Sequence, residues 1–275
     1  MASSSSTPAQ PGLWAESRIA IKVRHNIFAA VLCAFLVLVP HALAQEQVDG
    51  PTALIITYHA KSGGRSAFRK VMQTEGVAQL NKWQKEGVFS SYNALFTAYA
   101  AASEPDMFLV LRFKHFTDLG NWQKVEETYP GGLTEKAQTL GAAETSDTAD
   151  IVDEGSSAPT TKDSQFFVLE YDVTVDMPKY VSYVHGYVTP QFKGWATAGV
   201  LSSYSCFVNQ NPAGAPWSSL IVLEYKDLKS LSAREVVKTK TRAELATTDA
   251  TWKKWSDDKT AVRKEKAAIP VLSLN

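Results

Sequence analysis

The sequence predicts an α+β protein that contains two consecutive copies of one strand–helix–strand–strand–helix–strand unit. The prediction depends on three pairs of similar segments, which occur in the same order in both halves of the chain. The pairs are "WQKEGVFSSY" from Trp83 with "WATAGVLSSY" from Trp195, "FLVLRFKHFTDL" from Phe108 with "LIVLEYKDLKSL" from Leu220, and "LIITY" from Leu54 with "FVLEY" from Phe167. Their offsets are 112, 112 and 113 residues, and similarity at a nearly constant offset indicates an internal repeat.

Each copy begins with a strand and a helix. The first strands, Ala53–His59 and Phe166–Asp172, are rich in β-branched and aromatic residues. In the first copy, apolar residues recur at helical spacing over Ser66–Glu86. In the second copy, the helix opens with Asp176–Pro178, an N-cap residue followed by a proline in the first turn. Pro190 is expected to kink or split this helix.

Two further strands are predicted in the middle of each copy. Gly87 and Gly199 follow the first helices, as C-terminal glycines do. The second strands are "VFSSYNALF" and "VLSSYSCFV", and the third strands are "MFLVLRF" and "SLIVLEY". The Ser-Ser pairs have no glycine-flanked elbow around them, so we interpret them as small residues for close packing rather than as nucleophiles.

The last part of each copy is helical and differs most between the copies. In the first copy "PGG" (130–132) breaks the helix, whereas in the second copy the helix continues through "TWKKWSDDKTAVRKEK". The last strands are expected at Ala149–Glu154 and Ile269–Leu274. The stretch Gly155–Ser164 is small and polar. We therefore assign residues 45–155 to the first repeat, 156–164 to a linker and 165–275 to the second repeat.

A βαββαβ unit forms a four-stranded antiparallel sheet with both helices on one face, the ferredoxin-like arrangement. The opposite face of the sheet is open and must be covered. The second copy is the obvious cover, so we expect two tandem ferredoxin-like units packed sheet to sheet as an intramolecular pseudo-dimer. Because covalent fusion replaces the dimerisation of two single units, we also expect a monomer.

Residues 1–44 are predicted to be a secretory signal peptide. Arg18, Lys22 and Arg24 precede the apolar run Ile27–Val39, and an A-x-A pattern ends at Ala44. The run of 13 residues is shorter than the roughly 20 that a membrane-spanning helix needs. We therefore expect a periplasmic or secreted protein that has no membrane contact after cleavage. Retention of the segment as an anchor is the alternative.

The net charge and the number of cysteines limit which partners and which covalent links the chain can be expected to have. The chain has 28 basic and 28 acidic residues, of which the predicted signal holds three and one, so the remainder carries a net charge of −2. Without a basic surplus, nucleic acid is not an expected partner. Cys206 is the only cysteine after the signal, so no internal disulfide forms. No basic neighbour in its strand lowers its pKa, and we expect a buried, inert thiol.

The duplicated "W-x-x-x-G-V-x-S-S-Y" and the C-terminal "W-x-x-W…VRKEKAAIP" resemble the dimeric α+β barrel superfamily, which includes NIPSNAP-like and antibiotic-biosynthesis-monooxygenase-like proteins. The resemblance covers Thr52–Asn275 and implies a barrel made from two sheets. Some relatives bind haem through one histidine, which would make His185 the candidate here, although no cofactor is our main expectation. Haem-degrading relatives depend on an asparagine at the first-strand position that carries Thr57 or Glu170 in this chain, which argues against that activity.

Strand alternation assigns the two faces of each predicted sheet. One face is apolar and is assigned to the helices: Leu54, Ile56, Tyr58, Leu109, Leu111, Phe113 and their counterparts in the second copy. The other face holds Ile55, Val110, Val168 and Val222, together with a few polar residues. These polar residues are the candidate site.

Six polar residues on this inner face are the candidate site residues. Arg112, Thr57, His59 and Asp172 are candidates for ligand binding, and Glu170 and Glu224 are candidates for catalysis. Because the first and third strands are neighbours, we expect the two glutamates to lie close together. They could share a proton and supply a base, while Arg112 could hold an anionic group. The alternative is that Arg112 forms a structural ion pair with one of the glutamates.

The leading functional hypothesis is that the chain binds a small, largely apolar molecule in a cavity between its two sheets, because an apolar lining with a few polar groups is typical of ligand sites. The alternatives are a cofactor-independent monooxygenase or isomerase-like enzyme, and a structural envelope or partner-binding module. No metal site is expected, since His59, His115 and His185 have no second histidine or cysteine at ligand spacing.

Overall fold

The structure, a computed structural model, describes residues 49–275. The predicted signal, residues 1–44, lies outside the described residues, so its cleavage and the export of the protein stay predictions. Among the helices of the described part, none has the length and apolar character needed to cross a membrane.

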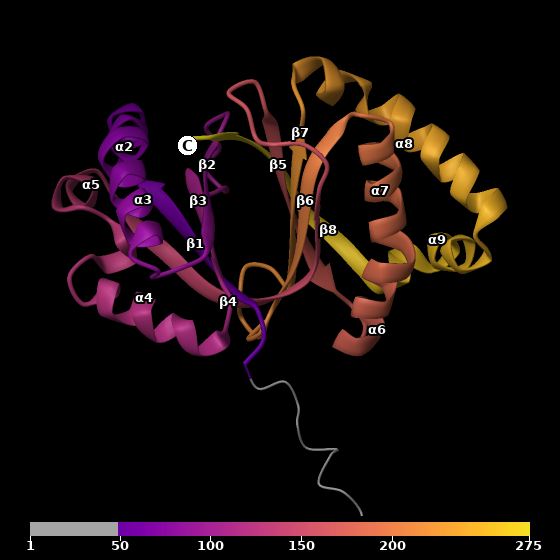
Figure 1. Ribbon diagram of the computed structural model, residues 1–275, viewed down its shortest axis with the longest axis horizontal. Helices are drawn as coiled ribbons and strands as arrows, with labels where there is room; N and C mark the ends of the chain where they lie inside the picture. The colour runs from indigo at the N-terminus through magenta and orange to yellow at the C-terminus, as the bar shows by residue number, and fades with distance from the viewer. Residues whose placement is uncertain (1–48) are drawn as a thin grey trace, which may run out of the picture. The chain divides into compact units, whose positions relative to one another are not determined.

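The strands of residues 49–275 close into one antiparallel barrel (Figure 1). Around the barrel their order is β1-β3-β2-β8-β5-β7-β6-β4. The strands are β1 (Thr52–Ala60), β2 (Ser91–Thr97), β3 (Met107–Phe113), β4 (Gly141–Ser156), β5 (Gln165–Val173), β6 (Leu201–Asn209), β7 (Ser219–Tyr225) and β8 (Arg263–Ser273). The chain is therefore an α+β protein, as the sequence predicts.

The two halves of the barrel have the same strand order. It is β4-β1-β3-β2 in the first half and β8-β5-β7-β6 in the second. The halves are joined edge to edge, because β4 also pairs with β6 and β8 also pairs with β2. An open sheet edge leaves backbone N–H and C=O groups unpaired. Closing the barrel pairs these edges, which packing of two separate sheets face to face would not do.

Strand β4 is longer than the predicted strand Ala149–Glu154 because it serves both halves. Its first part, from Gly141, pairs with β1, and its last part, up to Ser156, pairs with β6. The small polar residues that suggested a linker begin inside this strand. A stretch with two hydrogen-bonded neighbours stays extended even where its own composition favours a loop.

The helices cover the outside of the barrel, with α2–α5 against the first half and α6–α9 against the second (Figure 1). In the first half they are α2 (Arg65–Val71), α3 (Val77–Lys85), α4 (Leu119–Glu126) and α5 (Glu135–Leu140). In the second half they are α6 (Met177–Tyr183), α7 (Thr189–Thr197), α8 (Leu228–Thr248) and α9 (Ala250–Val262). Short 3-10 turns, η3 (Phe116–Asp118) and η4 (Pro130–Gly132), flank α4.

The first helical segment of each half, α2–α3 and α6–α7, contains a π-helical turn at the same place. The turns are η2 (Met72–Gly76), between α2 and α3, and η5 (Val184–Val188), between α6 and α7. Pro190 lies in the first turn of α7, as expected for a proline that splits a helix. The first half has the same interruption without a proline, so the proline accommodates the break and does not cause it alone.

The helix ends follow the predicted chemistry in part. The side chain of Asp176 accepts a hydrogen bond from the backbone N–H of Lys179 and caps α6. Gly87 and Gly199 adopt φ values of 78° and 75°, which favour glycine. The predicted helix through "RKEK" is wrong, because α9 ends at Val262 and β8 begins at Arg263, with Arg263, Lys264 and Glu265 paired with β5.

Side chains fill the inside of the barrel. The helix-facing residues predicted from strand alternation do pack against the helices, and Ile55, Val110, Val168 and Val222 face inward. The largest inward side chains are Phe108, Phe166, Phe207 and Trp217, and all four are buried. The middle of the barrel is therefore a packed core, and the open space between the two halves lies at one end of the barrel.

Candidate functional site

The six polar residues predicted to form one site lie at two opposite ends of the barrel. Strands β5 and β7 are antiparallel, and their register pairs Glu224 with Phe166 but Glu170 with Leu220. The two glutamates are thus separated by four residues along β5, and the expected carboxylate pair does not form. Because β5 and β7 run in opposite directions, a residue near the end of β5 and a residue near the end of β7 lie at opposite ends of the strand pair.

One end of the barrel is closed by Arg112. Its guanidinium donates hydrogen bonds to Asn93 Oδ1 (2.7 Å), Ser205 Oγ (2.9 Å) and Glu154 Oε2 (3.3 Å). Burial lowers the pKa of Arg112, and the carboxylate of Glu154 opposes this effect. Arg112 therefore forms an ion pair with Glu154, and the predicted alternative, an ion pair with Glu170 or Glu224, is wrong. Arg112 thus links β3 to β2, β4 and β6 through its side chain.

Glu224 lies at the same end and is also fully engaged. Its carboxylate accepts hydrogen bonds from Ser203 Oγ (2.6 Å), Ser164 Oγ (2.8 Å) and Thr160 Oγ1 (3.1 Å). Three hydroxyl donors satisfy a buried carboxylate without a cation. Glu224 therefore has a structural role, and Ser203 serves as a hydrogen-bond donor to it rather than only as a small packing residue.

The opposite end of the barrel opens into a pocket of about 350 Å³, which we call the mouth pocket. It brings together three of the predicted residues, Thr57, His59 and Glu170. Glu170 is 9% exposed, and burial raises the pKa of its carboxyl to about 7, with Lys266 opposing the rise. Asp172 does not line this pocket and instead pairs with Lys266 at 3.4 Å.

His59 lies at the rim of the mouth pocket between two carboxylates. Its Nε2 is 2.9 Å from Glu144 Oε2, and its Nδ1 is 3.7 Å from Asp106 Oδ2. The side chain is 40% exposed. Its Nε2 thus contacts Glu144 directly, while its Nδ1 has only a longer-range ionic neighbour in Asp106.

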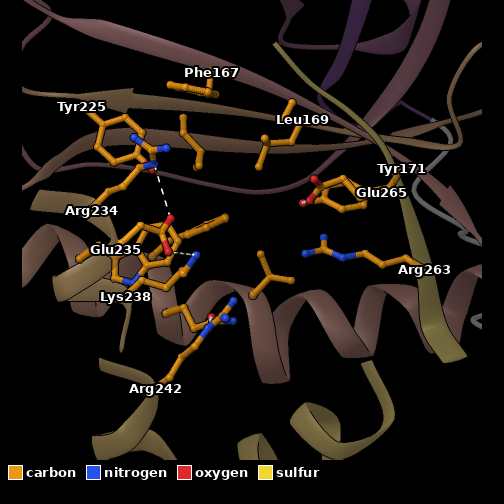
Figure 2. Close-up of a pocket in the computed structure, with 16 residues that line it drawn as sticks. Phe167, Leu169, Tyr171, Tyr225, Arg234, Glu235, Lys238, Arg242, Arg263 and Glu265 are labelled. Carbon is orange, nitrogen blue, oxygen red and sulfur yellow. Dashed lines mark hydrogen bonds and ion pairs between the residues drawn. The ribbon is translucent and has the colours of Figure 1, made fainter. Parts of the chain in front are cut away.

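A second pocket lies outside the barrel, between the sheet of the second half and helices α7 and α8. Its volume is about 250 Å³ (Figure 2). Apolar side chains from both layers form its walls: Phe167, Leu169, Leu223 and Tyr225 from the sheet, and Val188, Phe192 and Trp195 from the helix side. Charged residues from α8 and β8 complete it: Arg234, Glu235, Lys238, Arg242, Arg263 and Glu265. We call this the Arg263 pocket.

Arg263 is the most constrained charge in this pocket. Its guanidinium lies over the ring of Tyr171, 3.7 Å from the centroid, and 5.3 Å from the ring centroid of Tyr183. Its Nη1 is buried and has no hydrogen-bond partner among the described residues. A buried donor without an acceptor costs about 1–3 kcal/mol, and more for a charged group. Residues 49–275 therefore supply no acceptor for this buried donor.

The cations outnumber the carboxylates around the Arg263 pocket. Arg242 donates to Gln191 Oε1 at 2.7 Å and has no acidic partner among the described residues. Glu235 accepts from Lys238 and lies 3.6 Å from Arg234. Figure 2 shows these cationic side chains approaching the pocket from α8 on one side, with Arg263 entering from β8 on the other. An anion entering the pocket would meet a net positive charge.

The two tyrosines that line this pocket, Tyr171 and Tyr225, keep their hydroxyl protons. Burial raises the pKa of Tyr171 and of Tyr225 to about 12. The hydroxyl of Tyr171 reaches Glu265 Oε2 at 3.5 Å. Neither tyrosine loses its proton near neutral pH, so neither supplies a base or an anionic ligand for a metal.

A further hollow of about 270 Å³ adjoins the other side of Arg263. It shares Tyr171, Arg242, Arg263 and Glu265 with the Arg263 pocket and adds Lys259. The guanidinium of Arg263 thus stands between two hollows, and positive charge lines both.

Comparisons with known proteins bear on the fold. The sequence matches no protein-family profile and no curated protein. A protein from Fusobacterium nucleatum subsp. nucleatum ATCC 25586, provisionally assigned as a monooxygenase, has a similar structure with a TM-score of 0.52 and 13% identity, over 82% of this chain and 93% of the other. A protein from Lactobacillus acidophilus NCFM with the same provisional assignment has a TM-score of 0.52 and 9% identity, over 82% and 95%.

The closed barrel and these two similarities agree. Residues 49–275 form a closed antiparallel α+β barrel, and these two proteins have a similar fold. A heme-binding protein from Thermus thermophilus also matches, with a TM-score of 0.48 and 9% identity over 82% of this chain and 92% of the other. Such a distant similarity does not bear on the cofactor, so the barrel's own residues must be tested for haem.

The residues of the Arg263 pocket do not fit haem. Haem iron in proteins is held by histidine, cysteine, methionine or tyrosine. The pocket lining contains no histidine, cysteine or methionine, and its tyrosines keep their protons. His185, the predicted candidate, is 53% exposed on η5, with its Nδ1 3.7 Å from Asp153. Residues 49–275 also bring together no group of three metal-ligating side chains.

The Arg263 pocket was not predicted from the sequence, although some of its residues form a recognisable pattern. Arg234, Lys238 and Arg242 recur at intervals of four residues, which places them on one face of α8. Arg263 follows the last helix in the segment "VRKEK". What could not be seen was that β8 begins at Arg263 and brings it to the same hollow. Cys206, by contrast, is buried as expected, and burial raises the pKa of its thiol.

Proposed function

We propose that this chain binds a small amphipathic anion, such as an aromatic or aliphatic carboxylate, in the Arg263 pocket. The unpaired, buried Nη1 of Arg263 carries the proposal. Buried polar groups in folded proteins nearly always have a partner, and an exception needs an explanation. A carboxylate oxygen at this position would supply the missing acceptor in a charge-assisted hydrogen bond.

The rest of the pocket supports the same ligand class. The aromatic and aliphatic walls would bury the body of the ligand, while Arg242 and Lys238 would attract its charged group. The volume of about 250 Å³ is suited to a molecule smaller than a typical drug. The predicted signal peptide suggests that the ligand is met outside the cytoplasm. We also infer that the halves of the barrel are tandem ferredoxin-like units, since they share one strand order and one π-helical turn.

The oxygenase alternative would act on an aromatic acid bound in the same place. Two proteins of the same fold carry a provisional monooxygenase assignment, but this fold hosts many functions, so the fold alone does not choose. Oxygen consumption in the presence of an electron-rich aromatic acid, without added cofactor, would favour the enzyme. The module alternative predicts that no small molecule binds.

Titration calorimetry of the purified chain with benzoate and octanoate tests the proposal, with benzyl alcohol as the uncharged comparator. Both anions should bind and the alcohol should not. Arg263→Gln should weaken binding at least tenfold, since a hydrogen bond to a charged group is worth about 1.5–3 kcal/mol. Lys240→Gln is the matched control, because Lys240 lies on the same helix, 78% exposed and outside the pocket. Equal binding by wild type and Arg263→Gln would overturn the assignment.

A further inference from the structure

The mouth pocket differs in character from the Arg263 pocket. It lies at the end of the barrel where β1, β4 and β5 meet the loops before β3 and β7. Its polar lining is made of hydroxyl and carboxylate groups with one imidazole: Thr57, His59, Ser103, Glu144, Thr145 and Glu170. No lysine or arginine of the described chain lines it. The pocket therefore presents hydrogen-bond acceptors and negative charge.

Glu170 has no partner because the two repeats differ at its neighbour. In the first half, Thr57 pairs with Thr145 across β4, and their hydroxyl oxygens are 2.9 Å apart. At the corresponding place in the second half, Glu170 faces Ala267 on β8 and Leu220 on β7. Neither neighbour has a polar side chain. Within residues 49–275 the carboxylate of Glu170 takes part in no hydrogen bond and no ion pair. A molecule bound in the mouth pocket could therefore pair with it.

The charges around Glu170 do not compensate it. Glu104, from the loop before β3, and Asp172, on its own strand, both disfavour its negative charge. Lys266 on β8 is the cation that favours the charge, but its Nζ is held by Asp172 at 3.4 Å and by the carbonyl of Pro216 at 2.5 Å. His59 is held by Glu144 at the rim. A buried carboxylate surrounded in this way lacks a cation.

We propose that the mouth pocket binds a small organic cation, a primary or secondary ammonium, with Glu170 as its counter-ion. An ammonium group has only donors, and apart from His59, which Glu144 holds at the rim, the polar lining offers carboxylate and hydroxyl groups to it. The pairing gains strength from burial, because charges interact more strongly where water is excluded. This site is separate from the Arg263 pocket, and neither proposal depends on the other.

Proton release distinguishes this site from non-specific attraction. Glu170 is protonated below a pH of about 7, so an ammonium ion must displace the proton to pair with the carboxylate. Binding should therefore strengthen about tenfold for each pH unit up to pH 7 and then level off. At pH 6, binding should release close to one proton for each ammonium bound.

Calorimetry with n-butylammonium in two buffers of different ionisation enthalpy measures both affinity and proton release. We expect binding with proton release at pH 6, and none by n-butanol. Glu170→Gln should lose at least tenfold in affinity and all proton release. Glu154→Gln, which changes an exposed glutamate at the closed end of the barrel, should bind as wild type does.

Three outcomes would overturn the proposal. The first is no binding of n-butylammonium by wild-type protein at pH 8. The second is equal binding by Glu170→Gln when urea unfolding shows that variant to be folded. The third is an affinity that does not change between pH 5 and pH 8.

Discussion

Replacing Glu170 by glutamine should stabilise the fold, and the gain should depend on pH. The carboxyl of Glu170 titrates near pH 7 in the folded chain, against an ordinary value of 4.5, because burial disfavours its charged form. The folded state therefore holds this proton more tightly than the unfolded state does. Protonated Glu170 costs little, whereas ionised Glu170 destabilises the fold.

The sign and size of the effect follow from this difference. Below pH 4.5 both states are protonated and the pKa difference has no effect. As the pH rises from 4.5 to 7, the unfolded chain loses the proton first, and the free energy of unfolding falls. Each tenfold difference in the ionisation constant corresponds to about 1.4 kcal/mol, so the full loss is about 3 kcal/mol. Typical domains have only about 5–15 kcal/mol of stability, so this loss is measurable.

Urea unfolding of both proteins, followed by circular dichroism between pH 4 and pH 8.5, is the assay. Subtracting the wild-type free energy of unfolding from that of Glu170→Gln removes every other titration that the two proteins share. The difference should be near zero at pH 4 and should reach about 3 kcal/mol in favour of the variant at pH 8. A difference that stays constant with pH, or one that favours wild type as pH rises, would refute the reasoning about burial.

Three further predictions concern the barrel core, a helix end and the cysteine. Trp217→Ala should lower the free energy of unfolding by about 3–5 kcal/mol in urea, because the side chain is 0% exposed inside the barrel; a loss below 1 kcal/mol would mean that the interior is not packed. Gly199→Ala should lower the free energy of unfolding by about 1 kcal/mol, because the φ of residue 199 is 75° and no described atom lies within 4 Å of the added methyl group. Gly120→Ala, in helix α4, also meets no described atom within 4 Å and is the control, which should be neutral or stabilising. Cys206 should resist alkylation by iodoacetamide at pH 8 until the chain unfolds, because burial raises its pKa, and rapid labelling of the folded protein would contradict this.

Local features of the fold were predictable because they depend on neighbours in the sequence. The order of strands and helices along the chain, the glycine that ends each first helix, the Asp176 cap and the apolar helix-facing stripes follow from periodicities of 2 and 3.6 residues and from local hydrogen bonding. The internal repeat added long-range information, since it paired segments 112 residues apart. It did not supply the strand register.

The candidate site was predictable only in part, for the same reason. Thr57, His59 and Glu170 do meet at one end of the barrel, because alternation placed them on one face and β1 and β5 occupy related positions. Glu224 and Arg112 fell at the other end, since antiparallel register is decided by contacts between residues far apart in the sequence.

The amino-acid sequence was sufficient to predict the α+β class and the faces of the strands, because each residue's environment repeats with the period of its own element. How the sheet edges join and whether the interior is filled became visible only in three dimensions. The tertiary structure also decided that Arg263 begins a strand beneath helices α7 and α8 with one donor unpaired. These outcomes depend on side-chain volumes and on the pairing of distant backbone groups, which no local pattern records.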